Sequence, residues 1–287
     1  MTDREPYKKL RPEKKSSSSI MKLEWPTIIF FLLVHGLGIV ALQQFSWSAF
    51  LMLIFLGWVT GCLGLTLGYH RLLSHRSCSV PKWLERTFAT FGALSAEYGP
   101  IQWVGLHRQH HKFSEQALDP HNIKRGFWWA HIGWMLFRVP GEKRVRRYTA
   151  DLRKDPYYRW LDKYFLLLQI PLAVVLFLLG GWHWVLWGIP LRIVVVYHLT
   201  WCINSVVHTW GTQPFDSNDN SRNNRIMGWL AFGEGWHNNH HAYPSSAKHG
   251  LQGQFDLTWY IIVVLRALRL ATNVRVPKIN TINQGGV

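Results

Sequence analysis

The chain has 287 residues, of which 48% are hydrophobic and 15% aromatic, with 17 tryptophans and a formal net charge of +16. This length allows one membrane domain or about two soluble ones. The tryptophans indicate interfacial belts or an aromatic-lined tunnel. The charge favours anionic partners, but we expect no nucleic acid because much of the chain would lie in lipid. The three cysteines form no CxxC motif, which excludes a thiolate metal site.

Four apolar segments are predicted to span a membrane, because each approaches the 20 or so apolar residues that a bilayer requires. They form two hairpins: 27–45 with 47–69, and 164–189 with 190–210. We expect an all-α membrane domain over 26–272, in which a cytoplasmic helical cap holds the polar segments. A basic N-terminal tail, 1–25, is predicted to be disordered, and 273–287 form a C-terminal tail.

Two further apolar stretches are predicted not to span. Residues 87–106 are interrupted by Gly99-Pro100 and are expected to be buried in the protein or to lie at the interface. Residues 257–271 carry two arginines, which is typical of an interfacial helix. Lysine and arginine crowd 4–22, 138–163 and 266–278. By the positive-inside rule, both termini and the segment 70–163 are cytoplasmic.

Three histidine motifs lie far apart in the sequence but at one predicted membrane face. They are HRLLSH at His70–His75, HRQHH at His107–His111 and HNNHH at His237–His241. The last two each place histidines at i, i+3 and i+4, which share one face of a helix. His70 and His75 stand about 140° apart on a straight α-helix. They can both bind metal if the helix changes near Leu72–Ser74, or if they serve different ions.

His208 is a ninth candidate ligand, and Asn204, four residues earlier, points the same way. Nine imidazoles exceed the coordination of one ion, so the pattern predicts a binuclear site. Imidazole binds zinc, iron, copper and nickel alike, and spacing alone leaves the metal open. The remaining histidines are interpreted as hydrogen-bonded packing residues: His35, His121, His131, His183, His198 and His249.

The flanking sequence resembles the membrane fatty-acid desaturases, and in particular their Δ9 branch. The resemblance lies in GLTLGYHRLLSHRS, GLHRQHHKFSEQALDPHNIKRGFWWAHIGWML, NSVVHTWG and GEGWHNNHHAYPSSAKHG, and it covers residues 30 to 272. This branch includes stearoyl-CoA desaturases and cyanobacterial acyl-lipid Δ9 desaturases, and the compact chain is closer to the latter.

The resemblance implies two iron ions that activate O2 and desaturate an unactivated methylene pair to a cis double bond. It assigns as ligands His70, His75, His107, His110, His111, His208, His237, His240 and His241, with Asn204 holding a water near one iron. Protein made in excess is expected to hold zinc instead, because zinc stands above iron in the affinity order.

The resemblance also implies a bent apolar tunnel for the acyl chain. Trp103, Thr200 and Trp201 would shape the bend, and Trp58 and Cys62 would close the far end. Glu97 stands where the acyl-CoA enzymes carry an amide pair, so this difference favours a membrane glycerolipid over acyl-CoA as the substrate. Lys124 and Arg125 would bind a phosphate or polar headgroup, or form a solvated basic turn.

The chain carries no HPGG-type haem motif, so an external electron donor is expected, and the charge favours an acidic one such as ferredoxin. The predicted function is Δ9 desaturation of a C16 or C18 glycerolipid chain in a plasma or thylakoid membrane. The same chemistry on acyl-CoA and a fatty-acyl hydroxylase are the alternatives. A haem carrier is disfavoured because the histidines cluster at one face, and a zinc transporter because the spans contain almost no acids.

Overall fold

The computed structural model describes residues 21–138, 142–251 and 253–278. In these ranges the protein is helical, and β-structure is limited to isolated bridges such as Leu23 with Phe137. Residues 1–20 and 279–287 of the two predicted tails lie outside the described residues.

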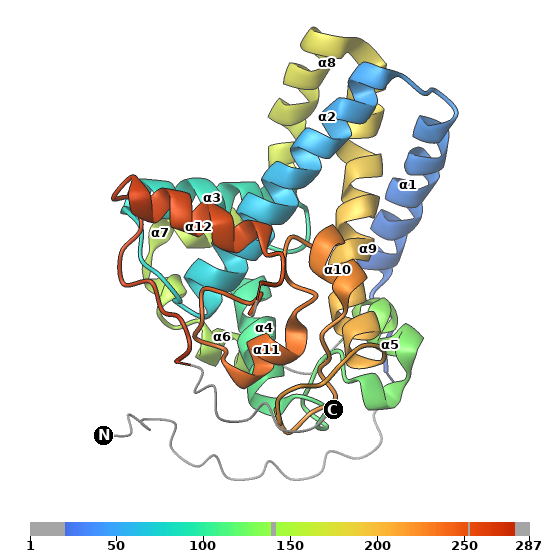
Figure 1. Ribbon diagram of the computed structural model, residues 1–287. Coiled ribbons are helices and arrows are strands. Elements are labelled where there is room, and N and C mark those ends of the chain that lie inside the picture. The colour runs from blue at the N-terminus through green and yellow to red at the C-terminus, as the bar shows by residue number, and fades with distance from the viewer. Residues whose placement is uncertain (1–20, 139–141, 252, 279–287) are drawn as a thin grey trace.

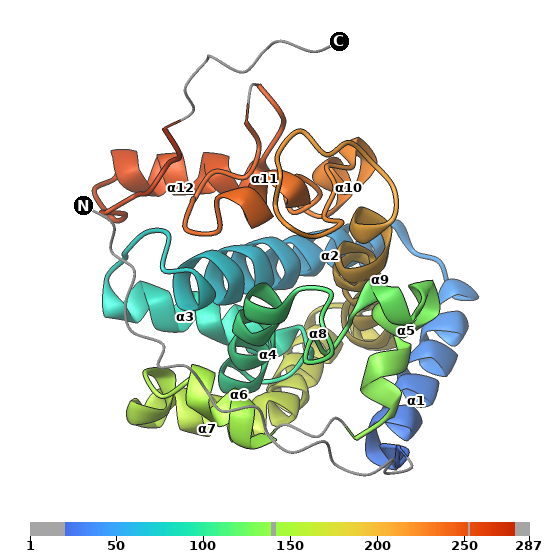
Figure 2. The same cartoon turned by 90° about the horizontal axis from the view of Figure 1, so that it is seen from below.

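One part of the molecule is a tall bundle of apolar helices (Figure 1). It comprises α1 (Trp25–Leu42), α2 (Trp47–Gly57) with η1 (Trp58–Ser74), and η5 (Phe165–Leu168), α8 (Gln169–Leu186), η6 (Trp187–Leu191), α9 (Arg192–Ser205) and η7 (Val206–His208). The preceding helix, α7 (Pro156–Tyr164), packs against α3 and α4 in the other part of the molecule (Figure 2). Within the described residues, three helical stretches are long and apolar enough to cross a membrane: Trp25–Leu42, Trp47–Ser74 and Pro156–His208.

The third stretch breaks its helical geometry at Gly181, whose φ of 63° and ψ of −160° are accessible mainly to glycine. Around this bend α8 and α9 run as two arms, and the bend and the α1–α2 connection lie at the same end of the bundle (Figure 1). Leu178, near the bend, is 76% exposed, and many other large apolar side chains of these helices are also exposed. A surface of this kind is suited to lipid.

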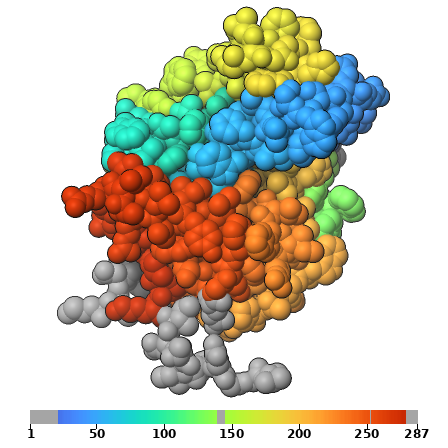
Figure 3. Space-filling view, turned by 45° about the horizontal axis from the view of Figure 1, so that its top comes forward, coloured from blue at the N-terminus to red at the C-terminus, as the bar shows by residue number. Residues whose placement is uncertain are grey.

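The other part is a cap of shorter helices at the opposite end (Figure 2). They are α3 (Lys82–Leu94), α4 (Pro100–Phe113), η2 (Ile123–Arg125), α5 (Phe127–His131), η3 (Gly133–Leu136), α6 (Glu142–Tyr148), η4 (Leu152–Lys154), α10 (Arg225–Leu230), α11 (His237–Ala242) and α12 (Leu257–Ala267). The C-terminal segments form one continuous layer against η1 and its neighbours (Figure 3).

The predicted break in 87–106 is confirmed, because α3 ends at Leu94 and α4 begins at Pro100. Proline suits the first turn of a helix, where its missing N–H costs nothing. The Asp162 carboxylate accepts hydrogen bonds from the N–H groups of Ile101 and Gln102, at 2.9 and 3.0 Å. These two hydrogen bonds tie the start of α4 to α7. The predicted apolar helix near the C-terminus is α12, and its place at a membrane interface stays a prediction.

A buried arginine ties the bundle to the cap. The Arg192 guanidinium donates to the Leu94 carbonyl at 2.6 Å, to the Gly188 carbonyl at 2.8 Å and to the Gln169 Oε1 at 3.0 Å. Since Arg192 has no exposed surface, these acceptors replace its hydration and fix α9 against α3 and α8.

The helix η1 lies directly on α3 because two of its glycines face the α3 backbone. A Cβ on Gly64 would come within 2.4 Å of the Gly92 nitrogen, and one on Gly68 within 2.7 Å of the Phe88 carbonyl oxygen. These contacts set how closely the segment that carries His70 and His75 approaches the cap.

We therefore expect Gly64→Ala to lower the free energy of unfolding by about 3 kcal/mol, because backbone atoms cannot yield to the added methyl group. Thermal unfolding in detergent micelles measures this. Gly36→Ala in α1 is the matched control, since a Cβ there has nothing within 4 Å and alanine favours a helix by about 1 kcal/mol. Equal stability of the two variants would contradict this packing.

Candidate metal centre

The helix η1 is wound as a π-helix, and this winding brings His70 and His75 to the same face. The His75 N–H donates to the His70 carbonyl at 3.1 Å, which is the i→i+5 bond of a π-helix. Their ring centroids lie 4.8 Å apart. The predicted helix change is therefore present, but it begins at Trp58 rather than near Leu72, and it places both histidines in one cluster.

The nine predicted histidines gather into two clusters, in each of which the candidate ligand atoms lie within 4.8 Å of one another. The five-histidine cluster comprises His70, His75, His107, His111 and His240. The four-histidine cluster comprises His110, His208, His237 and His241. Both α4 and α11 contribute to both clusters, so the i, i+3, i+4 spacing serves two sites at once.

The two asparagines of HNNHH fix the short helix α11. The Asn238 side chain pairs with the backbone of Phe215, accepting its N–H at 2.8 Å and donating to its carbonyl at 2.9 Å. The Asn239 amide donates to the His249 carbonyl at 2.9 Å. Six residues form a helix of marginal stability on their own, so these bonds hold its three histidines in place.

The ring nitrogens within each cluster are arranged as ligands of one ion would be. The Nε2 atoms of His75 and His107 lie 2.7 Å apart, and those of His110 and His241 lie 3.4 Å apart. Two imidazoles that bind one metal ion, each about 2.1 Å from it, stand roughly 3 Å apart. The donor set therefore fits a metal ion in each cluster.

Neutral imidazoles are the form that binds metal. Burial, followed by the charge of neighbouring imidazoles, holds the pKa of five cluster histidines well below the ordinary value: His75, His107, His111, His237 and His240. These five imidazoles are thus neutral at neutral pH.

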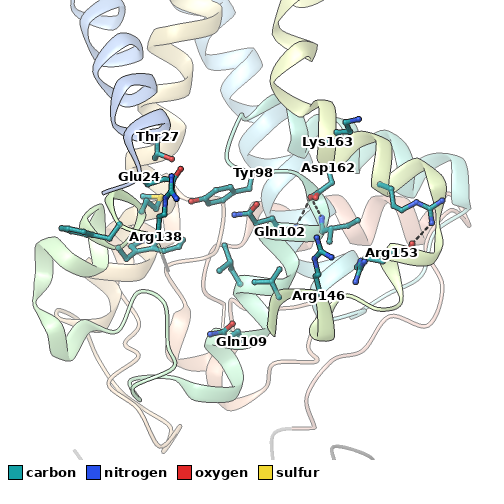
Figure 4. A pocket seen from close by; sticks show the side chains of 17 residues that line it. Glu24, Thr27, Tyr98, Gln102, Gln109, Arg138, Arg146, Arg153, Asp162 and Lys163 are labelled. Carbon is teal, nitrogen blue, oxygen red and sulfur yellow. Dashed lines mark hydrogen bonds and ion pairs between the residues drawn. The ribbon is translucent and has the colours of Figure 1, made fainter. Parts of the chain in front are cut away.

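A cavity of about 810 Å³ opens along α4, and its wall carries five basic side chains: Arg138, Arg146, Arg153, Arg159 and Lys163. Figure 4 shows Tyr98 and Gln102 lying between Arg138 and Arg146 on this wall. Its two acids are engaged, because Glu24 pairs with Arg138 at 3.0 Å and Asp162 caps α4. The cavity therefore favours an anionic group.

A smaller cavity adjoins the first, and a second small cavity adjoins that one and reaches the histidines. One of about 40 Å³ shares Tyr98, Leu106 and Trp134 with the large cavity. The next, of about 70 Å³, is bordered by His70, His107, His110 and His237, and otherwise mainly by apolar side chains. Gly61 and Phe232 lie on its wall away from the basic side chains. This series of spaces would suit an extended apolar ligand with a polar end.

The structure brings some of the predicted substrate residues to these spaces. Trp103, Thr200 and Asn204 line both small cavities, and Glu97 lines the one of about 40 Å³. Trp201 instead lines a separate cavity of about 150 Å³, which also borders Glu97.

The other four predicted substrate residues are absent from these walls. Trp58 and Cys62 lie on η1 on either side of Gly61, and the Cys62 thiol lies 3.5 Å from the Thr258 hydroxyl. Lys124 pairs with Glu115 at 3.4 Å, and the Arg125 guanidinium lies 3.2 Å from the centre of the Trp129 ring. These contacts position the Lys124-Arg125 turn, and binding of a headgroup there stays a prediction.

Comparison with known proteins identifies the family. A match to the fatty acid desaturase family spans residues 45–260. The chain belongs to the fatty acid desaturase family.

Among its relatives, an sn-1 stearoyl-lipid 9-desaturase of Synechocystis sp. is 48% identical over 256 residues, which cover 88% of this chain and 80% of the relative. An sn-2 palmitoyl-lipid 9-desaturase of Nostoc sp. is 47% identical over 270 residues, covering 92% and 94%. An icosanoyl-CoA 5-desaturase of Limnanthes douglasii is 43% identical over 254 residues, covering 87% and 71%.

Carboxylates support the histidines of this desaturase from behind. Four Nδ1 atoms lie beside a carboxylate oxygen: those of His70 (Glu234, 2.7 Å), His110 (Asp119, 3.0 Å), His208 (Glu115, 3.2 Å) and His241 (Asp219, 2.6 Å). Such a partner keeps the proton on Nδ1 and turns the Nε2 lone pair toward the cluster. The facing Nε2 atoms of His110 and His241 then cannot bond to each other, which again favours a cation between them.

The carboxylates were not predicted from the sequence. Although burial alone would raise it, His110 holds the pKa of Asp119 well below its ordinary value, so this side chain stays ionised. Glu234 also lies 3.2 Å from Arg71 and from His249, and His121 lies 3.7 Å from Asp119. His121 and His249, which we interpreted as packing residues, are therefore buried neighbours of the supporting carboxylates. The one sequence signal for these carboxylates was that Glu234 lies only three residues before the HNNHH motif.

Three other histidines that we interpreted as packing residues, His35, His131 and His198, contact one another in a row. His198 lies 3.2 Å from His35 and 3.0 Å from His131, ring nitrogen to ring nitrogen, which confirms the packing interpretation. His183 differs, because it is exposed on α8.

We expect the iron-reconstituted desaturase to hold two metal ions per chain. His240→Ala should lose at least one ion, because it removes one of the five side chains of the five-histidine cluster, and it should abolish turnover. Metal analysis by mass spectrometry measures the ratio. The exposed His183→Ala is the control and should keep both ions. An unchanged metal content in His240→Ala would contradict the assignment.

Asp219→Asn should weaken retention of one ion by about 10- to 100-fold, because the amide no longer fixes the His241 tautomer. Dialysis against graded chelator concentrations gives the midpoint of metal loss. Asp216→Asn, an exposed change in the same loop, should leave that midpoint in place. If both variants retained metal equally, the carboxylate would have no part in holding His241.

Proposed function

We propose that this desaturase introduces a cis double bond at the Δ9 position of a saturated C16 or C18 chain esterified to a membrane glycerolipid. The observation that carries the proposal is the position of the two histidine clusters beside small apolar cavities that adjoin a basic one. The cyanobacterial relatives, which are a stearoyl-lipid and a palmitoyl-lipid 9-desaturase, support the glycerolipid substrate.

The nine histidines would hold two iron ions, with Asn204 near the four-histidine cluster through a water molecule. Bound iron would supply the activation of O2 and the oxidising power that an unactivated C–H bond requires. Because carbon positions along an alkyl chain differ little in reactivity, the protein must select one by position. Trp103 and Thr200 would fix the chain where the cavities pass the clusters.

The far end of the acyl chain would lie against Gly61 and Phe232. A Cβ on Gly61 would approach the Phe232 ring to 2.8 Å, so these two residues leave no further space between them. Trp58 and Cys62 would influence chain length through the placement of η1, and Trp201 would support Thr200 and Glu97. The basic cavity wall would receive the polar end of the lipid.

We further propose four spans in two hairpins, with both termini and the clusters on the cytoplasmic side of a plasma or thylakoid membrane. The reversal at Gly181 supports two arms in the third apolar stretch. Electrons would come from an acidic donor such as ferredoxin, attracted by the net charge of +16. Zinc in overproduced protein would leave it inactive.

Expression in a desaturase-deficient host should yield a Δ9 monoene that appears first in intact glycerolipids. Lipid analysis with separate profiling of glycerolipid and acyl-CoA pools measures this, and His240→Ala is the inactive control. First appearance in acyl-CoA would keep the reaction but overturn the glycerolipid substrate. A hydroxylated product would replace desaturation by hydroxylation. No product from iron-loaded protein with a working donor would refute the proposal.

A further inference from the structure

Glu97 is a buried carboxyl group at the point where the small cavities meet the histidines. It is 7% exposed, and its Oε2 atom has no hydrogen-bond partner in the described part of the chain. It lines the cavity of about 40 Å³ together with His107 and Asn204. An unpaired polar atom in such a position is costly and needs an explanation.

The backbone around Glu97 is strained in a way that presents its side chain inward. Ala96 and Tyr98, on either side of it, have φ values of 64° and 66°, a region that residues with a Cβ adopt at a cost. The segment is held by the Tyr197 hydroxyl, which donates to the Ala96 carbonyl at 2.5 Å, and by the Ser95 hydroxyl, which accepts the Glu97 N–H at 3.2 Å.

The surroundings of Glu97 favour the neutral carboxylic acid. Burial raises the pKa of Glu97 to about 8, although the approach of Thr200 and Trp201 opposes this rise. The titratable groups around it are Tyr98 and Tyr197, with His107 and His121 across the cavity; none of these tyrosines provides a positive charge.

The second carboxyl group on these cavity walls, Glu234, has the opposite character. It contacts Arg71 and His70, so it is ionised and committed to holding a histidine. Glu97 is therefore the carboxyl group of the described cavity walls that can carry a transferable proton.

The proposed reaction consumes protons. A CH2–CH2 pair, O2, two electrons from the external donor and two protons give a CH=CH pair and two water molecules. The acyl chain supplies two of the four hydrogens in this water, and solvent must supply the other two. The two small cavities hold only about 70 and 40 Å³, so an acyl chain that occupied them would leave little room for water. A protonated group on their wall is then the nearest source of protons on this side of the clusters.

Building on the proposed desaturation, we propose that Glu97 is the proton donor that passes solvent protons to the oxygen being reduced at the histidine clusters. Its carboxyl O–H bond breaks as an O–H bond of water forms, and the carboxylate then takes up a proton from solvent. Tyr98 lines both this small cavity and the large basic one, so the large cavity is the route by which the proton is replaced.

The test is Glu97→Gln, which keeps the shape of the side chain but cannot release a proton. We expect turnover to fall at least tenfold, with the KM for lipid and the two-metal content unchanged. Electrons consumed per double bond should at least double, with hydrogen peroxide released. A merely structural role for Glu97 would change KM or metal content instead. The exposed Asp216→Asn is the control and should behave as wild type.

Infrared spectroscopy gives a second measurement that does not depend on turnover. At pH 7 the wild-type protein should show a carboxylic-acid C=O band that Glu97→Gln lacks and Asp216→Asn retains. Absence of this difference, or wild-type turnover and electron use in Glu97→Gln, would overturn the role of Glu97. If the wild-type protein formed no double bond, the proposed function itself would fail, whereas the band would still show whether Glu97 is protonated.

Discussion

The fold depends on gathering nine imidazoles into two clusters with their ring nitrogens turned toward one another. Without a cation this arrangement is unfavourable, because ring nitrogens such as those of His110 and His241 face each other at 3.4 Å. Carboxylates placed behind the rings hold that orientation. Because the whole chain has only 16 acidic residues, the use of Glu115, Asp119 and Asp219 for this purpose is a strong constraint on its loops.

The same requirement explains two of the places where helical geometry departs from the ordinary α-form. The π-winding of η1 aligns His70 with His75, and the 3₁₀ turn η7 ends on His208. The short helix α11 persists because buried asparagine amides tie it to neighbouring loops. Each departure costs stability locally and is located where a histidine must reach a cluster, which is typical of functional sites.

The sequence predicted the apolar helices, the break at Gly99-Pro100 and the set of clustered histidines, because all three depend on local spacing. It could not predict the π-winding of η1, because this segment packs closely on α3 at Gly64 and Gly68, a contact that local spacing does not reveal. It offered Lys124 and Arg125 as a headgroup site or a solvated basic turn, and headgroup binding there stays a prediction. It did not predict the basic cavity, because the side chains between 138 and 163 that line it are brought together only when α6 and α7 pack against α4.

The sharing of α4 and α11 between the clusters has a consequence for assembly. Each of these helices carries ligands for both ions, so neither cluster can be ordered while the other is loose. Binding of the first ion orders both helices, so the binding of the second ion loses less conformational entropy. Loading should therefore be cooperative: chains with two ions and chains with none should predominate at substoichiometric metal, and chains with one should be rare.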